Sequence, residues 1–329
     1  MDLRLRAAAL RKLRLALLNW YDRHRRALPW RESADPYRVW ISEIMLQQTR
    51  VAAVLDHYAR FLRRFPDVQA LACARESSVL AAWSGLGYYH RARRMHRAAK
   101  VLVRQRKGRF PRTAEEWQQL PGIGRYTAAA IASIAFGEAV AVVDGNVERV
   151  LERMFAGTGA RQATWDRAEW LLDRGHPGDF NQAMMELGAT ICTPRAPQCP
   201  ACPLHLWCAS RGADAARPQA ARKRKQLTYG LARNNGSVLL VQRPRTAALM
   251  AGMWELPSVP PGHGNGSAPT LILRHSITDT DYEVSVIVLS PEEWAGFESA
   301  AHWVSRKQLA RLALTGLARK ILLRLSAAG

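Results

Sequence analysis

Four of the five cysteines lie within 17 residues of one another, at Cys192, Cys199, Cys202 and Cys208. Soft thiolate ligands at this spacing suit a zinc ion or an iron–sulfur cluster, and the thiolate count alone does not separate the two. The alternative is four unrelated buried cysteines. The odd total argues against a closed set of disulfides and favours a reducing compartment. We expect the fifth, Cys73, to fill the core of an alanine-rich helix.

Two carboxyl groups have surroundings that would give them different protonation states. Glu43 lies in the apolar helical stretch 40–46, and apolar surroundings raise a carboxyl pKa, which suits a general acid. Asp144 follows the apolar run 139–143 and precedes a Gly-Asn turn, where backbone N–H groups can hold it ionised. An acid beside a carboxylate can break a glycosidic bond. Either residue taken alone is more often an ordinary helix or turn carboxylate.

The segment Leu-Pro-Gly-Ile-Gly at 120–124 joins two predicted helices, the second of which spans 125–136. Gly122 and Gly124 permit unusual backbone angles and close approach of another molecule. The free N–H groups at the start of the second helix could bind a phosphate through hydrogen bonds and the helix dipole. The alternative is an ordinary corner between helices.

The charge of the chain favours a polyanionic partner. The net charge is +21, and residues 1–112 hold 25 basic and 8 acidic side chains. Such a field attracts nucleic acid, although solvated arginine-rich helix faces would give the same composition. No apolar run is long enough to span a membrane, and the N-terminus lacks the pattern of a signal peptide. We therefore expect a cytoplasmic protein with no membrane partner.

The length and the change in residue pattern along the chain predict two domains. Residues 1–209 have the spacing of helices, so we expect a mainly α N-terminal domain that ends with the cysteine loop 192–208. Residues 210–227 are polar, basic and proline-containing, and they indicate a linker. Residues 228–329 combine alternating β-type segments with a final helix and predict a smaller α+β domain.

Several motifs together resemble a known family. The LPGIG hairpin, the aspartate of VVDGNVERV and the cysteine loop resemble the helix-hairpin-helix DNA glycosylases that carry an iron–sulfur cluster. Three further strings are similar to MutY-type adenine DNA glycosylases: WISEIMLQQTRV, WSGLGYYHRARRMH and MAGMWELP. The resemblance implies a [4Fe–4S] cluster on the four cysteines. It also implies removal of adenine opposite 8-oxoguanine or guanine in double-stranded DNA, by a bacterial, nucleoid-associated enzyme, and we expect a monomer.

The resemblance also assigns roles to individual residues. Glu43 would be the general acid and Asp144 would stabilise the sugar cation, with Asn146 and Tyr126 beside them. Members of the family that also cut the strand carry a lysine where Tyr126 stands. No lysine occurs between Lys107 and Lys223, so we expect a monofunctional glycosylase.

Adenine cannot be reached inside a duplex and must be flipped out into a pocket. The positions that match the family's adenine pocket are Trp30, Arg31, Leu46 and Glu186, together with Tyr126. The positions that match its DNA contacts are Gln47, Gln48, Leu86, Tyr88, Gly122 and Gly124. Tyr88 could equally belong to the core.

Residues 228–329 resemble the Nudix-like C-terminal domain of the family, which recognises 8-oxoguanine. The glutamate-rich helix of a working Nudix hydrolase is absent from the sequence, so pyrophosphohydrolase activity is not expected. Thr278 keeps a hydroxyl where the family has a DNA-contacting serine, whereas Asp279 replaces a histidine. A carboxylate near the DNA backbone is unfavourable, so the preference for 8-oxoguanine is expected to differ or to be weaker.

Two other functions remain open at this stage. One is an endonuclease III-like glycosylase and lyase for oxidised pyrimidines, against which Tyr126 and the additional domain argue. The other is a non-enzymatic iron–sulfur sensor that binds DNA, which would need the cysteines and the hairpin but neither Glu43 nor Asp144.

Overall fold

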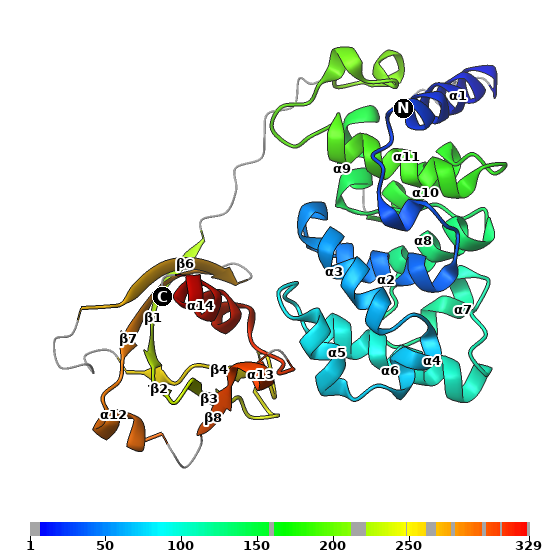
Figure 1. Cartoon of the computed structure of the whole chain (residues 1–329). Coiled ribbons are helices and arrows are strands. Elements are labelled where there is room, and N and C mark those ends of the chain that lie inside the picture. The colour runs from blue at the N-terminus through cyan, green and yellow to red at the C-terminus, as the bar shows by residue number, and fades with distance from the viewer. Residues whose placement is uncertain are drawn as a thin grey trace. The chain divides into compact units, whose positions relative to one another are not determined.

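Helices form the first two thirds of the chain and strands dominate the remainder of the computed structural model (Figure 1). The structure describes residues 7–157, 161–211, 222–247, 249–260, 268–277, 280–297, 301–309 and 311–327. The chain divides into two compact units. The first comprises Met1–Tyr58, Asp67–Gln69 and Arg97–Pro218, and the second comprises Ala59–Pro66, Ala70–His96 and Gln219–Gly329. The expected end of the first domain at residue 209 stays a prediction.

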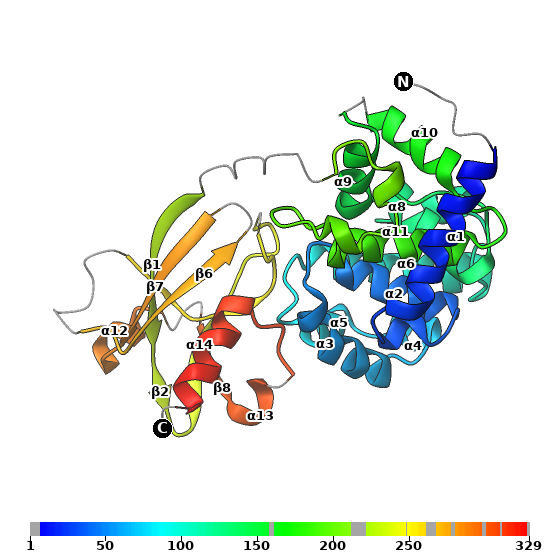
Figure 2. The ribbon, with the colours of Figure 1, turned by 90° about the horizontal axis from the view of Figure 1, so that it is seen from above.

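The helices of this part are short to medium in length, and they confirm the mainly α character predicted for it (Figure 2). They are α1 (Ala7–His24), α2 (Pro36–Leu46), α3 (Val51–Arg64), α4 (Val68–Cys73), α5 (Glu76–Trp83), α6 (His90–Arg106), α7 (Ala114–Gln118), α8 (Arg125–Phe136), α9 (Gly145–Met154), α10 (Arg161–Leu171) and α11 (Pro177–Thr190). Three 3₁₀ turns, η1 (Pro29–Arg31), η2 (Cys199–Ala201) and η3 (His205–Trp207), complete this part.

Local signals in the sequence explain where the helices around the site begin and end. The Asp35 side chain caps α2 by accepting a hydrogen bond from Arg38 N, and Pro36 occupies the first turn, where its missing N–H costs nothing. Helix α8 ends at Gly137, whose left-handed φ of 71° lets its N–H reach back to the last turn. The predicted hairpin of α7 and α8 is confirmed.

Small residues in α8 let this helix approach α2 closely. Residues 128–132 of α8 are all buried and four of them are alanines. Helix α2 packs against α8, so that its own buried face, which includes Glu43, meets the first turn of α8. A second core cluster joins α1, α9, α10 and α11, and Leu204 of the cysteine loop is buried in it. Each such aliphatic side chain contributes about 1.5–3 kcal/mol by burial, so this cluster fixes the start of α9 relative to the cysteine loop.

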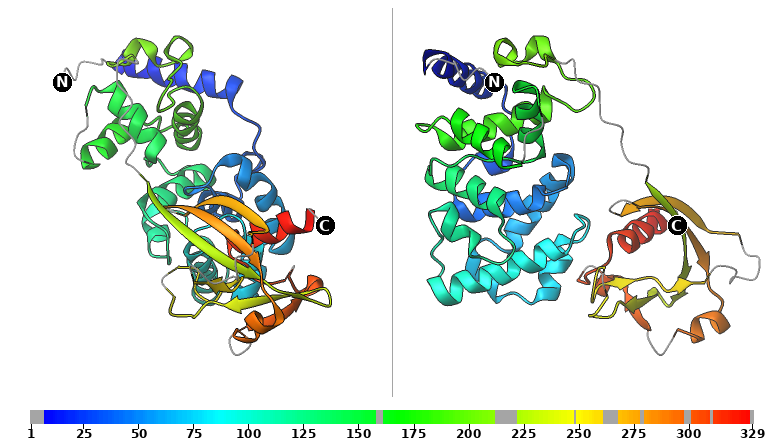
Figure 3. Two further views of the ribbon diagram at one scale, coloured as in Figure 1. Left: turned by 90° about the vertical axis from the view of Figure 1, so that its left-hand side faces the viewer. Right: turned by 180° about the vertical axis from the view of Figure 1, so that it is seen from behind.

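The strands of the second unit form two four-stranded sheets (Figure 3). Their bounds are β1 (Lys223–Leu231), β2 (Arg233–Asn234), β3 (Ser237–Gln242), β4 (Trp254–Glu255), β5 (Ser258–Val259), β6 (Leu271–Ile277), β7 (Thr280–Val288) and β8 (Ala301–Ser305), with helices α12 (Pro291–Ala295), α13 (Arg306–Leu309) and α14 (Gly316–Ala327). One sheet has the order β5-β1-β7-β6, and the other has β2-β3-β4 with β8 paired to β3. Apolar residues of both sheets and of α14 share one core.

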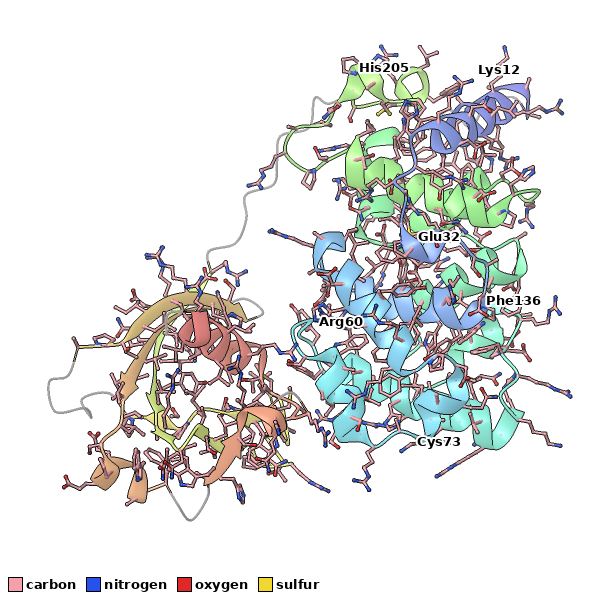
Figure 4. All side chains as sticks on the ribbon, viewed as in Figure 1. Lys12, Glu32, Arg60, Cys73, Phe136 and His205 are labelled. Carbon is pink, nitrogen blue, oxygen red and sulfur yellow. The ribbon has the colours of Figure 1, made fainter. Side chains whose placement is uncertain are left out.

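Two expectations from the sequence are wrong. The predicted linker extends to residue 227, but strand β1 begins at Lys223 and pairs in parallel with β7 from Thr280 onward. Its first residues are exposed and basic, so they have the composition of a linker although their backbone is in a sheet. Cys73 does not fill the core, because its side chain is exposed at the end of α4 (Figure 4).

The predicted lesion-contacting residues Thr278 and Asp279 lie outside the described residues, between β6 and β7. None of the helices in the described ranges is both long enough and apolar enough to cross a membrane.

Candidate active site and cysteine loop

The carboxyl group of Glu43 is buried where α2 meets α8. The residue is 6 % exposed. Burial raises its pKa to about 7, and the nearby charge of Asp144 also raises this pKa. A hydrogen bond from Tyr126 and the positive charge of Arg31 lower it in part. A carboxyl with a pKa near 7 holds a proton at neutral pH in a large share of molecules and can release it. The predicted acid therefore has the environment that this role requires.

Tyr126 stands in the first turn of α8 and faces Glu43. Its hydroxyl donates a hydrogen bond of 2.7 Å to Glu43 Oε2, and its oxygen lies 3.6 Å from Met185 Sδ. Burial and the nearby charges of Glu43 and Asp144 raise the pKa of Tyr126 well above its usual value. The side chain is therefore a neutral hydrogen-bond donor, and it provides no amine at this position.

Asp144 caps the N-terminus of α9. Its Oδ1 accepts hydrogen bonds from Asn146 N (2.9 Å) and Val147 N (2.7 Å), and its Oδ2 accepts one from Asn146 Nδ2 (2.9 Å). The three N–H groups and the positive end of the helix dipole stabilise a negative charge there. Asp144 also acts electrostatically on both Glu43 and Tyr126. The structure thus brings the two predicted carboxylates into one site and confirms the turn expected at Asp144.

Arg149 connects this capped turn to the cysteine loop. Its Nη2 donates to Asn146 Oδ1 (3.0 Å) and to the carbonyl oxygen of Gly188 (2.7 Å), and its Nε donates to the carbonyl oxygen of Cys192 (2.9 Å). A Cβ atom on Gly188 would lie 2.7 Å from Asn146 Cβ, so glycine is needed for α11 to approach α9. One guanidinium therefore ties together α9, α11 and the first cysteine.

Glu186 is buried at 1 % exposure and pairs with two arginines. Arg26 donates to both of its oxygens at 2.7 Å, and Arg31 Nη2 donates to Oε2 at 2.8 Å. Burial alone would raise the pKa of Glu186, but the hydrogen bonds from the two arginines prevail and hold it at about 2. The anion anchors Arg31, whose charge acts on Glu43. Two of the predicted pocket residues are thus in direct contact.

The other predicted pocket residues lie on neighbouring elements. Trp30 is 8 % exposed in η1 and packs edge to face against Tyr58, with the ring centroids 5.4 Å apart. Leu46 ends α2 and is half-buried. Nothing in the described contacts tests whether these two residues touch a base, so their role stays a prediction.

The residues predicted to contact DNA differ in how they are exposed. Gln48 is exposed with a left-handed φ of 52°, and Tyr88 is half-buried with a φ of 45°. Left-handed backbone at a non-glycine residue is strained by about 1–3 kcal/mol and clusters at functional sites. Gln47 is held by a hydrogen bond of 3.0 Å to Thr127 Oγ1. Leu86 is 5 % exposed, so it would have to leave its buried position before it could enter a duplex.

Tyr88 stacks on a buried arginine. The guanidinium of Arg91 lies 5.4 Å from the Tyr88 ring centroid and donates to the carbonyl oxygens of Leu86 and Gly87. Leu86 and Tyr88 belong to the second unit and Gln47 and Gln48 to the first, so a shared DNA surface for the four residues stays a prediction.

The hairpin glycines have the backbone freedom that the sequence predicts. Gly122 has a left-handed φ of 80°, and both Gly122 and Gly124 are exposed. Gly124 is the N-cap of α8, and as a glycine it has no side chain that could accept a hydrogen bond from the first turn. The first N–H groups of α8 are thus open to an external acceptor such as a phosphate.

The four predicted ligand cysteines share one region around η2 and η3. Burial raises the pKa of the Cys202 thiol to about 11, and the neighbouring Cys192, Cys208 and Cys199 raise it in addition. All four thiols are free and half-buried. In the ranges that the structure describes, no three His, Cys, Asp or Glu side chains already form a group that could hold a metal ion.

The surroundings of the cysteines fit a thiolate-bound group in their chemistry. Arg153 donates to Cys192 Sγ at 3.3 Å and to the carbonyl oxygens of Thr193 and Pro194. A cation beside a thiolate stabilises the ionised form that binds metal. Figure 4 shows His205 on the same loop, but the donor set of the prediction is the four sulfurs.

Three arginines in these contacts were not singled out by the sequence. Arg26 pairs with Glu186, while Arg149 and Arg153 hold the turn at Asp144 and the cysteine loop. Arg149 and Arg153 are four residues apart on one helix, a spacing which could have indicated that they face the same neighbours. Arg26 lies in an arginine-rich segment in which no signal distinguishes it.

Comparisons with known proteins indicate the family of the chain. Residues 41–170 match the model of the HhH-GPD superfamily base excision DNA repair proteins. The chain is 50 % identical over 211 residues to the adenine DNA glycosylase of Homo sapiens. This alignment covers 60 % of this chain and 39 % of the human protein. It is 42 % identical over 307 residues to that of Mus musculus, which covers 74 % of this chain and 59 % of the mouse protein.

Solved structures show the same fold. A thermostable thymine-DNA glycosylase is similar with a TM-score of 0.58 and 31 % identity, over 63 % of this chain and 100 % of that chain. An endonuclease III–DNA complex is similar with a TM-score of 0.54 and 23 % identity, over 62 % of this chain and 97 % of that chain, which shows the fold alone.

Proposed function

The chain belongs to the HhH-GPD superfamily of base excision DNA repair proteins, and from this premise we propose that it is an adenine DNA glycosylase. It hydrolyses the bond between adenine and deoxyribose in double-stranded DNA. The observation that carries the proposal is the buried Glu43 with a pKa near 7, hydrogen-bonded to Tyr126 and within the field of Asp144, which caps α9. Adenine DNA glycosylases from several organisms are similar in sequence.

In the proposed reaction Glu43 supplies the proton. Adenine is a poor leaving group until its ring is protonated, and the protonated carboxyl of Glu43 donates to a ring nitrogen of the flipped base. Burial makes this proton available at neutral pH, because the folded environment disfavours the carboxylate. The Tyr126 hydroxyl steadies the carboxylate that forms once the proton has left.

Asp144 acts on the sugar. As the glycosidic bond breaks, positive charge builds on the deoxyribose, and a fixed negative charge lowers the energy of that transition state. The three N–H groups around Asp144 hold its oxygens in place, so little reorganisation is needed. Water then adds to the sugar, and the products are free adenine and an abasic site.

The reaction ends with the strand intact, which makes the enzyme monofunctional. Strand cutting by members of this kind uses a lysine amine that forms a Schiff base. Tyr126 occupies that position and carries a neutral phenol, and no lysine lies between Lys107 and Lys223. This argues against an endonuclease III-like lyase, although the fold is shared.

We further propose that Cys192, Cys199, Cys202 and Cys208 hold a [4Fe–4S] cluster. The support is the donor set of four thiols in one loop together with the arginines that contact Cys192. When bound, such a cluster would cross-link the cysteine loop and thereby fix the position of the loop on α9 and α11. The residues proposed to bind and orient DNA are the hairpin glycines and the other predicted DNA contacts, not the cysteines.

The substrate pair is proposed as adenine opposite 8-oxoguanine or guanine, with the protein acting as a monomer on DNA in the bacterial cytoplasm. The C-terminal region would read the opposite base with the help of Thr278. Since Asp279 follows it, the preference for 8-oxoguanine over guanine is expected to be reduced by repulsion from the DNA backbone.

The test uses a duplex with one adenine opposite 8-oxoguanine, incubated with the protein and analysed with and without an alkali step. Strand scission only after alkali supports a monofunctional glycosylase. Scission without alkali contradicts it and favours a lyase. Release of adenine by wild type and its loss in Glu43→Gln, with DNA binding retained, excludes a binding protein without activity.

A further inference from the structure

The segment that leads into Asp144 has no secondary structure of its own. Residues 137–144 lie between α8 and α9 in an irregular conformation, and residues 141 and 142 are buried. Buried backbone N–H and C=O groups must find partners elsewhere. Side chains provide them: Ala141 N donates to Glu169 Oε1 (2.8 Å) and Val142 N donates to Asn181 Oδ1 (3.1 Å). The position of Asp144 therefore depends on the groups that hold this segment.

Asn181 makes the most extensive of these contacts. Its side chain accepts from Val142 N and donates through Nδ2 to the carbonyl oxygen of Val140 (2.8 Å) and to Ser133 Oγ (3.0 Å). The residue is 3 % exposed on α11. One amide thus binds the segment at Val140 and Val142, and it also binds Ser133 of α8, the helix that carries Tyr126. It joins the two halves of the site through fixed hydrogen bonds.

We propose that Asn181 is a positioning residue that sets the distance of Asp144 from the Glu43–Tyr126 pair. The inference rests on the proposed function. Only Val143 lies between Val142 and Asp144 along the chain, so a shift of the segment moves the carboxylate directly. A displacement of about 1 Å in such a site can lower a rate about 100-fold.

The amide has a chemistry that other side chains of this size lack. It offers an acceptor and two donors on one planar group. Leucine matches its volume but makes none of these hydrogen bonds. An aspartate keeps the acceptor for Val142 N, but it can donate to the carbonyl of Val140 only while it is protonated. This difference makes the proposal distinguishable from a simple contribution to the core.

The experiment compares Asn181→Leu, Asn181→Asp and wild type in single-turnover excision of adenine opposite 8-oxoguanine. Binding is measured separately on a duplex that contains a 2′-fluorinated, uncleavable adenosine. Asn181→Leu is expected to lose about 100-fold in rate and to keep its affinity within about threefold. Asn181→Asp should be intermediate and should recover towards the wild-type rate as the pH falls, because its carboxyl then regains the donor.

The pH profile provides a readout that a merely structural role would not move. Tyr126, Asp144 and Arg31 are the groups that act on Glu43. If Asp144 moves away, its charge raises the pKa of Glu43 less, so the rate of Asn181→Leu should decline at lower pH than that of wild type. Leu102→Ala, which truncates a buried side chain of α6 outside these hydrogen bonds, is the matched control for lost stability.

The outcomes separate the two proposals. Wild type that releases no adenine overturns the proposed function and this inference with it. Active wild type with an equally active, folded Asn181→Leu overturns the inference alone, as does a rate loss that Leu102→Ala reproduces at the same loss of thermal stability. If Asn181→Leu fails to fold, a folded Asn181→Asp with the wild-type rate at every pH overturns it equally.

Discussion

The hydrogen bond between Tyr126 and Glu43 should control the pH range in which the enzyme works. In Tyr126→Phe the 2.7 Å hydrogen bond to Glu43 Oε2 is absent while the ring remains. A hydrogen bond to a charged group is worth about 1.5–3 kcal/mol, and one pKa unit corresponds to 1.36 kcal/mol. The pKa of Glu43 is about 7 in the presence of this bond. Its loss should raise that pKa by roughly 1–2 units.

The direction of the pKa change follows from the fact that the Tyr126 hydroxyl donates the hydrogen bond to Glu43. The phenol stabilises the carboxylate, so removing it favours the protonated acid, and the acid then persists to higher pH. The rate of adenine excision by Tyr126→Phe should decline at a pH roughly 1–2 units above that of wild type. Its plateau should be somewhat lower, because a weaker acid transfers its proton less readily. Single-turnover rates between about pH 5.5 and pH 9.5 measure both.

The control is Tyr37→Phe, which removes the hydroxyl of another buried tyrosine, located on α2, the helix that carries Glu43. Its profile should coincide with that of wild type. A profile for Tyr126→Phe that stays in place, or that moves to lower pH, would refute the reasoning, since it would mean that Tyr126 does not stabilise the ionised form of Glu43.

Three further predictions concern the acid, the arginine link and the cysteines. Glu43→Gln should abolish excision. The pKa of Glu43 is raised from 4.5 to about 7 in the folded protein, so the stability of wild type should fall by roughly 3 kcal/mol as the pH rises through this interval. Glu43→Gln should not show this loss. Thermal unfolding at pH 5 and pH 8 measures the difference. Arg149→Met releases Asn146 and the Cys192 carbonyl together, so excision should fall at least about tenfold with the bound iron content also reduced; unchanged values of both would contradict the link. Cys199→Ser should lose the broad violet absorption of an iron–sulfur cluster, and a colourless wild type containing zinc would contradict that assignment.

The local pattern of the sequence was sufficient for much of the helical fold and for the surroundings of Glu43 and Asp144, whereas their roles came from the resemblance. The 12-residue helix after the hairpin, the turn at Asp144 and the apolar surroundings of Glu43 depend on residues a few positions apart, and such signals can be read without tertiary structure. The same locality explains the errors. A strand that begins with exposed lysines and arginines has the composition of a linker, and a cysteine among alanines has that of a core residue.

Tertiary structure alone decided which groups act on one another. Glu43 and Tyr126 are 83 residues apart, and Arg26 and Glu186 are 160 apart. With 48 lysines and arginines in the chain, no sequence pattern indicates which of them pairs with a buried carboxylate. The raised pKa of Glu43 and the hydrogen bonds of Asn181 to Val140 and Val142 arise only when α2, α8, α9 and α11 pack together. Burial and electrostatic coupling are properties of that packing, because both depend on distances in space that the chain order does not fix.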